Sequence, residues 1–324
     1  MTSPWRRRLM RLGPLLGLLL VVGFFAVASG APERYLSTNN LRVVLAQTVI
    51  VAIGATGMTL VIVGGGIDLA VGSTIALSGV LCALALRAGW PPLAGVLVGV
   101  LAGALVGVVN GLAITRLRVV PFIATLGTLG VARGVAKWLA SQTMVNPPPT
   151  WVNELAVTFP PAAWMVFAPG VWLALVLALL MAFVLRRTVF GRHVFALGSS
   201  EAAARACGIG VERLKVAVYS VAGLFFGLSG VMQMSRLRQG DPTVAAGTEL
   251  DVIAAVVIGG GSLNGGEGTV LGSMVGALVM AFLRNGSQQM GWPTYVQEIL
   301  IGVIIVVAVA VDRWRHAQQE ESES

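Results

Sequence analysis

The sequence predicts an all-α polytopic membrane protein with about ten transmembrane helices, some of them broken by glycine-rich turns. Of its 324 residues, 56% are hydrophobic and only 11% are charged, whereas soluble domains carry about 25% charged residues. Apolar runs of roughly 20 residues, the length that crosses a bilayer, recur along the whole chain. These runs do not alternate in polarity with a period of two, which excludes the strands of a membrane barrel. No polar stretch is long enough to fold separately, so residues 1–324 are predicted to form a single transmembrane domain.

The expected spans follow one another with short connections. The first, residues 13–28, comes after four arginines, and its end at Ala26-Val27-Ala28 also resembles a signal-peptidase site, so cleavage there is an alternative. The others are expected at residues 43–63, 74–86, 93–114, 121–139, 168–185, 216–234, 251–258, 269–283 and 295–311. The segment 251–258 is too short to cross alone and indicates a broken helix, which is tolerated where protein or a cavity surrounds it. Eight or nine full spans plus one re-entrant segment would fit nearly as well.

Basic residues predict the orientation, because cytoplasmic loops carry an excess of Lys and Arg. Ten spans put both termini inside, together with the arginines near each terminus, Arg116, Arg118 and residues 186–215. The loops 141–167 and 235–250 are then external. Arg236 and Arg238 run against this assignment.

The longest strongly basic polar stretch lies mid-chain at residues 186–215, called here the central basic segment. A short helix is expected inside it, capped by a serine, begun by an acid that suits the positive end of the helix dipole, and built from alanines. Its residues include Ser200, Glu201, Ala202, Ala203 and Arg205. Gly208 is expected to end it. Another protein docking on this helix, or a basic loop that only sets topology and rests on anionic lipid, both explain the pattern.

Glycines recur at every fourth position of the span 93–114, from Gly95 through Gly99, Gly103 and Gly107 to Gly111. Lipid provides no hydrophobic drive for helices to associate, so small residues at this spacing favour close packing of two helix backbones. The pattern predicts a packing role rather than a solute site.

Two glycine-rich turns resemble each other and suggest a weak internal repeat, with chance recurrence in this composition as the alternative. The run Val-Ile-Val-Gly-Gly-Gly at 61–66 matches Val-Val-Ile-Gly-Gly-Gly at 256–261. Matching broken helices in internal repeats are typical of transporters. Because glycine tolerates large backbone changes, the turns are candidate hinges. The candidate hinge residues are Gly65, Gly66, Gly259 and Gly260.

A few polar side chains at membrane depth are candidates for the pathway of a solute. Asp68 and Glu267 each follow a glycine-rich turn, and ionisable residues at this depth are functional candidates. Each also precedes a helix, where a carboxylate caps free N–H groups, and capping is the simpler interpretation. Asn110 and Thr125 could bind a polar solute or hold helices together.

Several function classes are excluded or unsupported. A phosphate-binding loop requires Gly-Lys-Ser/Thr, but the only lysines, Lys137 and Lys215, do not follow glycine, so the chain has no Walker ATP site. No nucleophile, base and orienting group stand together, which argues against an enzyme. The two cysteines and two histidines form no cluster, so a metal site has no support. The net charge of +8 sits mostly in short loops and does not indicate nucleic-acid binding.

Several motifs, in order, resemble the ribose-type permease subunits of bacterial ATP-binding cassette (ABC) importers, in the wider group that includes branched-chain amino-acid permeases. They are GIDLAVGS at 66–73, RVVPFIATLGT at 118–128, TVFGR at 188–192, EAAAR at 201–205 and GGEGT at 265–269. The resemblance covers nearly the whole chain. The departures are small: Ala70 stands where Ser is usual and Gly261 where Thr is common.

The resemblance implies a role and a set of partners. Such a permease sits in the bacterial inner membrane, surrounded by lipid, and pairs with a second permease copy, identical or not. Two cytoplasmic ABC ATPase subunits would bind the ATP, so this chain needs no cofactor, and residues 201–208 would be their docking site. An external solute-binding protein would meet the loops 141–167 and 235–250. The family expectation for the solute is a monosaccharide, and Phe122 is a candidate to stack on it. Phe122 is an equally good core or interface residue.

Two other classes remain possible from the sequence. A secondary transporter driven by an ion gradient would need a buried carboxylate, for which Asp68 and Glu267 are the candidates. A structural or assembly protein of the membrane would show no dependence on any solute.

Overall fold

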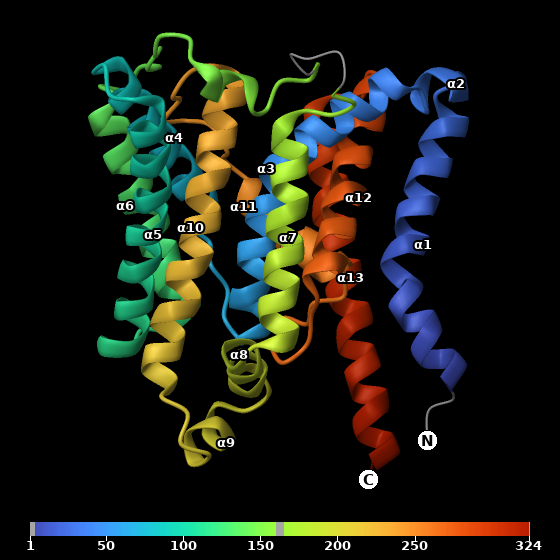
Figure 1. Cartoon of the computed structure of the whole chain (residues 1–324). Coiled ribbons are helices and arrows are strands. Elements are labelled where there is room, and N and C mark those ends of the chain that lie inside the picture. Colours follow the sequence, from blue (N-terminus) through green and yellow to red (C-terminus); the bar gives the residue numbers. More distant parts are fainter. Residues whose placement is uncertain (1–3, 160–164, 324) are drawn as a thin grey trace.

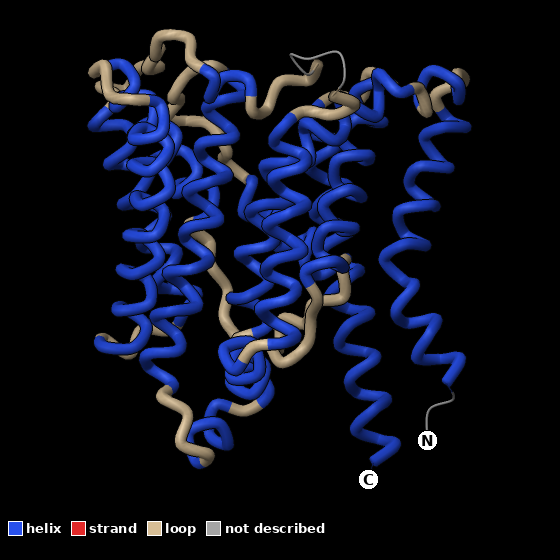
Figure 2. The backbone as a smooth tube through the Cα atoms, viewed as in Figure 1, coloured by secondary structure: helices blue, strands red, loops and turns tan. Residues whose placement is uncertain are grey.

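The computed structural model describes residues 4–159 and 165–323, and within these ranges the chain is almost entirely helical (Figures 1 and 2). It forms thirteen α-helices and one short 3-10 helix in the described part, and its only β-pairing there is an isolated bridge. The elements are α1 (Pro4–Ala28), α2 (Pro32–Tyr35), α3 (Thr38–Val63), α4 (Val71–Arg87), α5 (Pro92–Arg116), α6 (Pro121–Leu139), η1 (Trp151–Glu154), α7 (Pro169–Arg187), α8 (Val189–Ser199), α9 (Glu201–Ala206), α10 (Val211–Leu237), α11 (Thr248–Ile258), α12 (Val270–Gln289) and α13 (Thr294–Glu323).

Each of the ten predicted spans coincides with a helix, namely α1, α3, α4, α5, α6, α7, α10, α11, α12 and α13. This confirms the all-α polytopic class. By length and composition, five helices in the described part are long and apolar enough to cross a membrane: α3, α5, α7, α10 and α12. Shorter apolar helical stretches lie at Gly13–Ala28, Val71–Arg87 and Thr294–Val307. Helix α11 has 11 residues and spans about 17 Å. That is about half of a 30 Å hydrocarbon core, as expected for a broken span.

Helix α10 packs against α3, α4 and α5 (Figure 1). The glycine row of α5 is buried along this contact. A Cβ atom on Gly103 would lie 2.5 Å from the Cα atom of Gly227, and one on Gly111 would lie 2.7 Å from the Cα atom of Val216. Since both neighbours are backbone atoms of α10, the predicted packing role of the row is confirmed.

Helix α1 packs against α12, where Phe25 is buried over Gly286. Its ring also meets Trp292 edge-on, with the ring centroids 5.8 Å apart. The apolar end of α1 is therefore part of the core of this chain. An uncleaved first span stays the prediction, with cleavage after this segment as the alternative.

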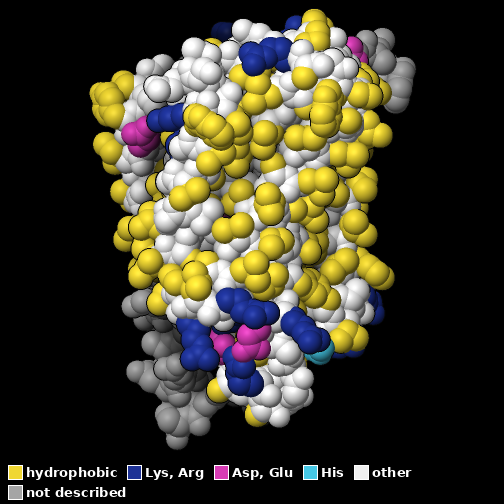
Figure 3. Space-filling model, turned by 90° about the vertical axis from the view of Figure 1, so that its left-hand side faces the viewer, with side chains coloured by type: hydrophobic (Ala, Val, Ile, Leu, Met, Phe, Trp, Pro, Cys, Tyr) yellow, Lys and Arg dark blue, Asp and Glu magenta, His cyan; other side chains and the backbone are white. Residues whose placement is uncertain are grey.

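The start of α1 and the end of α13 lie at the same end of the bundle as α8 and α9 (Figure 1). The loops around residues 145 and 240 lie at the opposite end, joined by an antiparallel bridge between Val145 and Gly240 with two N–H···O distances of 2.8 Å. Figure 3 shows hydrophobic side chains over most of the height of one face and charged side chains mainly at its lower end. The arrangement agrees with the prediction that both termini and the central basic segment lie on the same side of the membrane. That this side is the cytoplasmic one stays a prediction.

Two segments differ from the prediction. The central basic segment holds two helices, α8 and α9, because α8 buries Val194 and Leu197 in the core, and the first turn of α10 also belongs to it. The loop expected at 235–250 is shorter, since α10 continues through Leu237 and α11 begins at Thr248. Within the predicted loop 141–167, residues 160–164 lie outside the described part.

Candidate coupling and pathway sites

Helix α9 forms as the sequence predicts, with a cap at each end. The Ser200 hydroxyl accepts a hydrogen bond from the backbone N–H of Ala203 at 3.2 Å. At the other end Gly208 has φ +82°, and the N–H groups of Gly208 and Ile209 donate to the carbonyls of Arg205 and Ala204 at 3.0 and 3.1 Å. These two bonds make a Schellman motif, in which glycine is favoured at the left-handed position. The caps stabilise a helix of six residues that would be marginal alone.

The exposed face of α9 is free of the bundle. Glu201, Ala202, Ala203 and Arg205 are exposed, and only Ala204 is buried. In Figure 1 the helix lies beyond the end of α10, at the outer limit of the chain. The exposed alanines, with a charged side chain on either side of them, therefore form a small surface that is available for contact with another protein.

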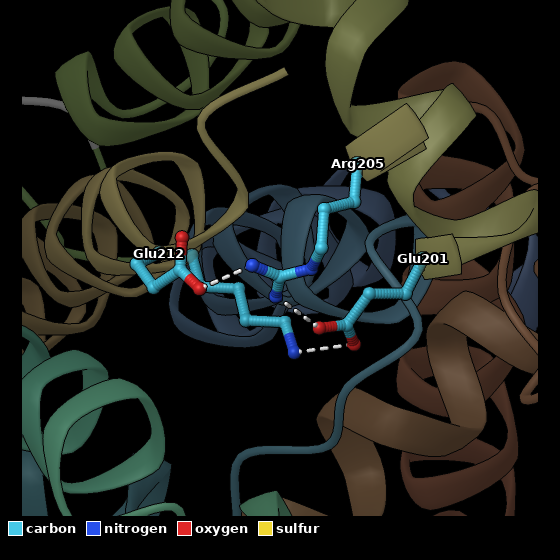
Figure 4. A network of polar contacts seen from close by, with 4 residues as sticks. Glu201, Arg205 and Glu212 are labelled. Atoms are coloured by element: carbon cyan, nitrogen blue, oxygen red, sulfur yellow. Dashed lines mark hydrogen bonds and ion pairs between the residues drawn. The ribbon is translucent and has the colours of Figure 1, made fainter. Parts of the chain in front are cut away.

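Ion pairs tie α9 to the first turns of α10 (Figure 4). Glu201 contacts the Lys215 amine at 2.7 Å and the Arg205 guanidinium at 3.2 Å, and Arg205 also contacts Glu212 at 2.6 Å. The hydrogen bond from Lys215 lowers the pKa of Glu201, and the one from Arg205 lowers the pKa of Glu212. The same pairs raise the pKa of Arg205. The four side chains are exposed or half-exposed, so the network orients α9 more than it stabilises the fold.

Both glycine-rich turns end a helix in the same way, which supports the internal repeat. After α3, the N–H groups of Gly65 and Gly66 donate to the carbonyls of Ile62 and Val61 at 2.9 Å. After α11, the N–H groups of Gly260 and Gly261 donate to Val257 and Val256 at 2.9 Å. In each case the first of the three glycines, Gly64 or Gly259, is the C-cap residue of the helix. The second glycine has a left-handed backbone conformation, with φ +79° at Gly65 and +88° at Gly260. Matching Schellman motifs thus end α3, which is long enough to cross a membrane, and α11, which is about half a span.

The two turns meet each other at the end of α8. The N–H of Gly266 donates to the carbonyl of Val63 at 2.9 Å. A Cβ atom on Gly265 would lie 2.8 Å from the Cα of Gly65 and 2.7 Å from the carbonyl oxygen of Gly198. The last turn of α8 is therefore in backbone contact with Gly65 of the first turn and with Gly265 in the connection between α11 and α12. Close approach at this junction requires glycine, which the sequence places at each position.

Asp68 is buried but does not cap α4, because the N-cap residue of that helix is Ala70 and no side chain caps it. The capping interpretation is therefore wrong for Asp68, whose carboxylate bonds within the connection before the helix. Asp68 is 1% exposed, and its Oδ1 atom accepts from the N–H of Ala70 at 2.8 Å. Its Oδ2 atom accepts from the Asn110 side-chain amide at 3.2 Å, so two of the predicted residues come together from separate segments. Thr125 joins them from α6, because its hydroxyl lies 3.4 Å from the Ile67 carbonyl and 3.0 Å from that of Pro121. The three side chains hold the 64–70 connection against α5 and α6.

Two other predicted residues lie away from this cluster. Phe122 is 49% exposed on α6 and contributes to the outer surface of the single chain. Glu267 is exposed, and α12 is capped instead by Thr269, whose hydroxyl accepts from the N–H of Gly272 at 3.0 Å. The prediction that Glu267 caps α12 is therefore wrong, because Thr269 stands next to the helix and reaches its free N–H group first. Asp68 and Glu267 were the two candidates for an ion-coupling carboxylate, and of these only Asp68 is buried.

Sequence reasoning missed several residues of the site. Tyr219, on α10 one turn after Lys215, is 3% exposed, and a Cβ atom on Gly66 would meet its hydroxyl. Asp251 and Arg284 pair at 2.6 Å between the start of α11 and the end of α12. Arg133 donates to the carbonyls of Pro242 and Val244 at 2.9 and 2.6 Å and holds that loop on α6. Its position as a charged residue inside a predicted span pointed to Arg133, whereas no local sequence pattern distinguishes Tyr219.

Comparisons with known proteins agree with these features. The family described as "Branched-chain amino acid transport system / permease component" matches residues 40–309. The ribose import permease protein RbsC of Escherichia coli (strain K12) is 39% identical over 311 residues, covering 96% of this chain and 95% of the relative. RbsC of Bacillus subtilis (strain 168) is also 39% identical, over 95% of this chain and 94% of its own length. The fructose import permease protein FrcC of Rhizobium meliloti is 34% identical, over 93% of this chain and 84% of its own length.

No solved structure matches the chain. The family match covers most of the described helices, from α3 to α13, and the relatives extend it to nearly the full length. The family is one of transport permeases and not of enzymes. The chain belongs to the family of branched-chain amino acid transport system permease components.

Proposed function

We propose that this chain is the membrane-spanning permease subunit of an ABC importer that moves a monosaccharide across the inner membrane of a bacterium. Relatives that match it over nearly its full length are named as import permeases for ribose and fructose, and another as an ABC transporter permease for L-arabinose. Full-length similarity to these proteins is the observation that carries the proposal. The polytopic helical fold supports it, because five helices in the described part are long and apolar enough to cross a membrane.

ATP is bound by partner subunits in this proposal. The two lysines of the chain stand outside any phosphate-binding loop, so hydrolysis must take place on cytoplasmic ATPases. Helix α9 offers them an exposed, capped helix at the outer limit of the bundle. The central basic segment, residues 186–215, is the coupling segment on this view.

Two links carry a displacement of α9 into the bundle. The ion pairs of Glu201 and Arg205 connect α9 to the beginning of α10, which packs against α3, α4 and α5. Ser200 alone separates α8 from α9, and Gly198 of α8 is in contact with Gly65 of the first hinge turn and with Gly265, which follows the second hinge turn in the connection to α12. ATP-driven motion would therefore reach both broken spans together. Gly65, Gly66, Gly259 and Gly260 are the proposed hinges, and Asp68, Asn110 and Thr125 brace the first of them.

The opposite end of the chain is the proposed receiving surface for the solute-binding protein. The Val145–Gly240 bridge joins the described residues of the loops 141–167 and 235–250, and the hydrogen bonds of Arg133 hold the second loop on α6. A rigid surface lowers the entropic cost of docking a partner. A second permease copy completes the complex, with the pathway between the two copies.

A pull-down from detergent tests the proposal. The full chain is co-expressed with candidate ABC ATPase subunits from the same genome, as wild type and as Glu201→Lys and Gly208→Pro. The first variant reverses a charge that contacts Lys215 and Arg205, and the second places proline where φ is +82°. Glu154→Lys is the matched control, because it makes the same charge change in the exposed η1 at the opposite end.

Wild type and Glu154→Lys should retain the ATPase, while Glu201→Lys and Gly208→Pro should lose it. Absence of any ATPase with the wild-type chain would contradict the importer. Equal retention by all four proteins would contradict docking on α9.

A further inference from the structure

A cavity of about 280 Å³ lies on the α9 side of the chain, inside a single copy. The turn after α3, the end of α8, the start of α9 and the beginning of α10 enclose it, and Gly65, Gly198, Lys215 and Tyr219 are among its walls. A wider cavity of about 420 Å³ adjoins it and shares the Glu201–Lys215 pair. Small-molecule sites typically measure about 300–1,000 Å³, so the inner cavity suits a small ligand.

The inner cavity has an apolar side and a polar side. Val61, Ile114, Leu197 and Val218 form the first. The second carries hydrogen-bonding groups of both kinds, from Tyr219, Lys215, Glu201 and Ser199. A sugar ring has the same division, with C–H groups on its faces and hydroxyls, which both donate and accept, around its edge.

The Tyr219 hydroxyl carries the inference. Its side chain is 3% exposed, and the hydroxyl has no hydrogen-bond partner among the described residues. Leaving a buried hydroxyl unpaired costs about 1–3 kcal/mol, so a partner from outside the chain is expected. The hydroxyl lies against Gly66, where no side chain competes for the space.

We infer that this cavity binds a neutral polyhydroxylated molecule of monosaccharide size. The Lys215 amine already pairs with Glu201 at 2.7 Å, so the polar side has no net charge that would select an anion. The inference rests on the proposed function, because the ligand is the imported solute held on the ATPase side. A bound solute lies between the first hinge turn and the start of α9 and opposes their approach, so accumulated solute slows import.

Thiol protection in the purified full-length chain tests the site without any partner. Ser199→Cys places a thiol on the cavity wall, and native Cys207, exposed at the end of α9, is not a lining residue and acts as an internal control. Cys82 is buried. Trypsin cleavage at Arg205 puts the two reactive thiols on different peptides, so mass spectrometry follows maleimide labelling of each. The probes are D-ribose, D-fructose and L-arabinose, with sodium sulfate at matched osmolality as the anionic comparison.

At least one monosaccharide should slow labelling at position 199 severalfold and leave labelling of Cys207 unchanged. Adding Tyr219→Phe, which removes only the hydroxyl, should raise the half-protecting concentration about 3- to 10-fold, as expected for one lost hydrogen bond. No protection by any of the three sugars, equal protection by sulfate, or the same half-protecting concentration with Tyr219→Phe overturns the inference.

Uptake of the same sugars by the reconstituted complex separates the two proposals. Uptake without protection removes the cavity site and leaves the importer intact. Loss of the ATPase from the pull-down and absence of uptake contradict the importer itself.

Discussion

Replacing Gly103 by alanine should weaken the contact between α5 and α10. The added methyl carbon would lie 2.5 Å from both the Cα and the backbone nitrogen of Gly227 on α10. Carbon atoms in contact prefer about 3.5–4.0 Å, so α5 and α10 must separate by roughly 1 Å at this point. The neighbouring atoms belong to the backbone, and no side-chain rotation can relieve the overlap.

The magnitude follows from two opposing effects. Inserting a methyl group into a well-packed contact costs about 1–3 kcal/mol. Alanine is a better helix former than glycine by about 0.5–1 kcal/mol, which offsets part of this cost. We therefore expect Gly103→Ala to lower the free energy of unfolding by about 1–2 kcal/mol.

Gly130 on α6 is the matched control. It is also a helical glycine, but a Cβ atom there has nothing within 4 Å. Only the helix-propensity effect remains, so Gly130→Ala should raise stability by about 0.5–1 kcal/mol. The two substitutions, chemically identical, should shift stability in opposite directions.

Thermal unfolding of the purified variants in one detergent, at one scan rate, measures the difference. The unfolding temperature of Gly103→Ala should fall by a few degrees, and that of Gly130→Ala should stay equal or rise. A Gly103→Ala protein as stable as wild type, or equal losses in both variants, would refute the reasoning from backbone contact.

Three further predictions concern function. The lowered pKa of Glu201 means that its pairs are intact above the ordinary glutamate pKa of 4.5 and are lost as the pH falls through the lower folded value. Hydrogen exchange in α9, corrected for intrinsic rates, should therefore be unchanged from pH 8 to 5.5 and rise below 4.5; a rise already near pH 6 would contradict this. Gly260→Val puts a β-branched residue at φ +88°, a conformational strain of about 1–3 kcal/mol without steric overlap, so uptake should be lost while the ATPase still co-purifies; normal uptake would remove the hinge. Asp68→Asn keeps an acceptor for the Ala70 N–H, so we expect this variant to retain some uptake, and we expect an uncoupler not to abolish it. If an uncoupler abolishes uptake by the wild type but not by the variant, ion coupling is favoured instead.

Local patterns in the sequence were enough to locate the helices. Apolar length places the spans, because a bilayer requires roughly 20 such residues, and it identifies α11 as half a span because only 11 residues are available. The spacing of the glycines from Gly95 to Gly111 predicts by itself that this helix packs closely against another helix. The caps of α9, Ser200 and Gly208, are likewise local, since each bonds within the helix that it ends.

The site depends on contacts between segments far apart in the chain. Asp68 and Asn110 are 42 residues apart and meet only because the 64–70 connection folds against α5. Tyr219 becomes a buried, unpaired hydroxyl only when Gly66 lies against it, and α8 is a helix in the core only because Val194 and Leu197 find neighbours there. Propensity, capping and hydropathy act over one or two helical turns and can therefore be recognised in sequence. The approach of two backbones at a glycine depends on how all the surrounding helices pack, and that arrangement creates both the hinge junction and the cavity beside it.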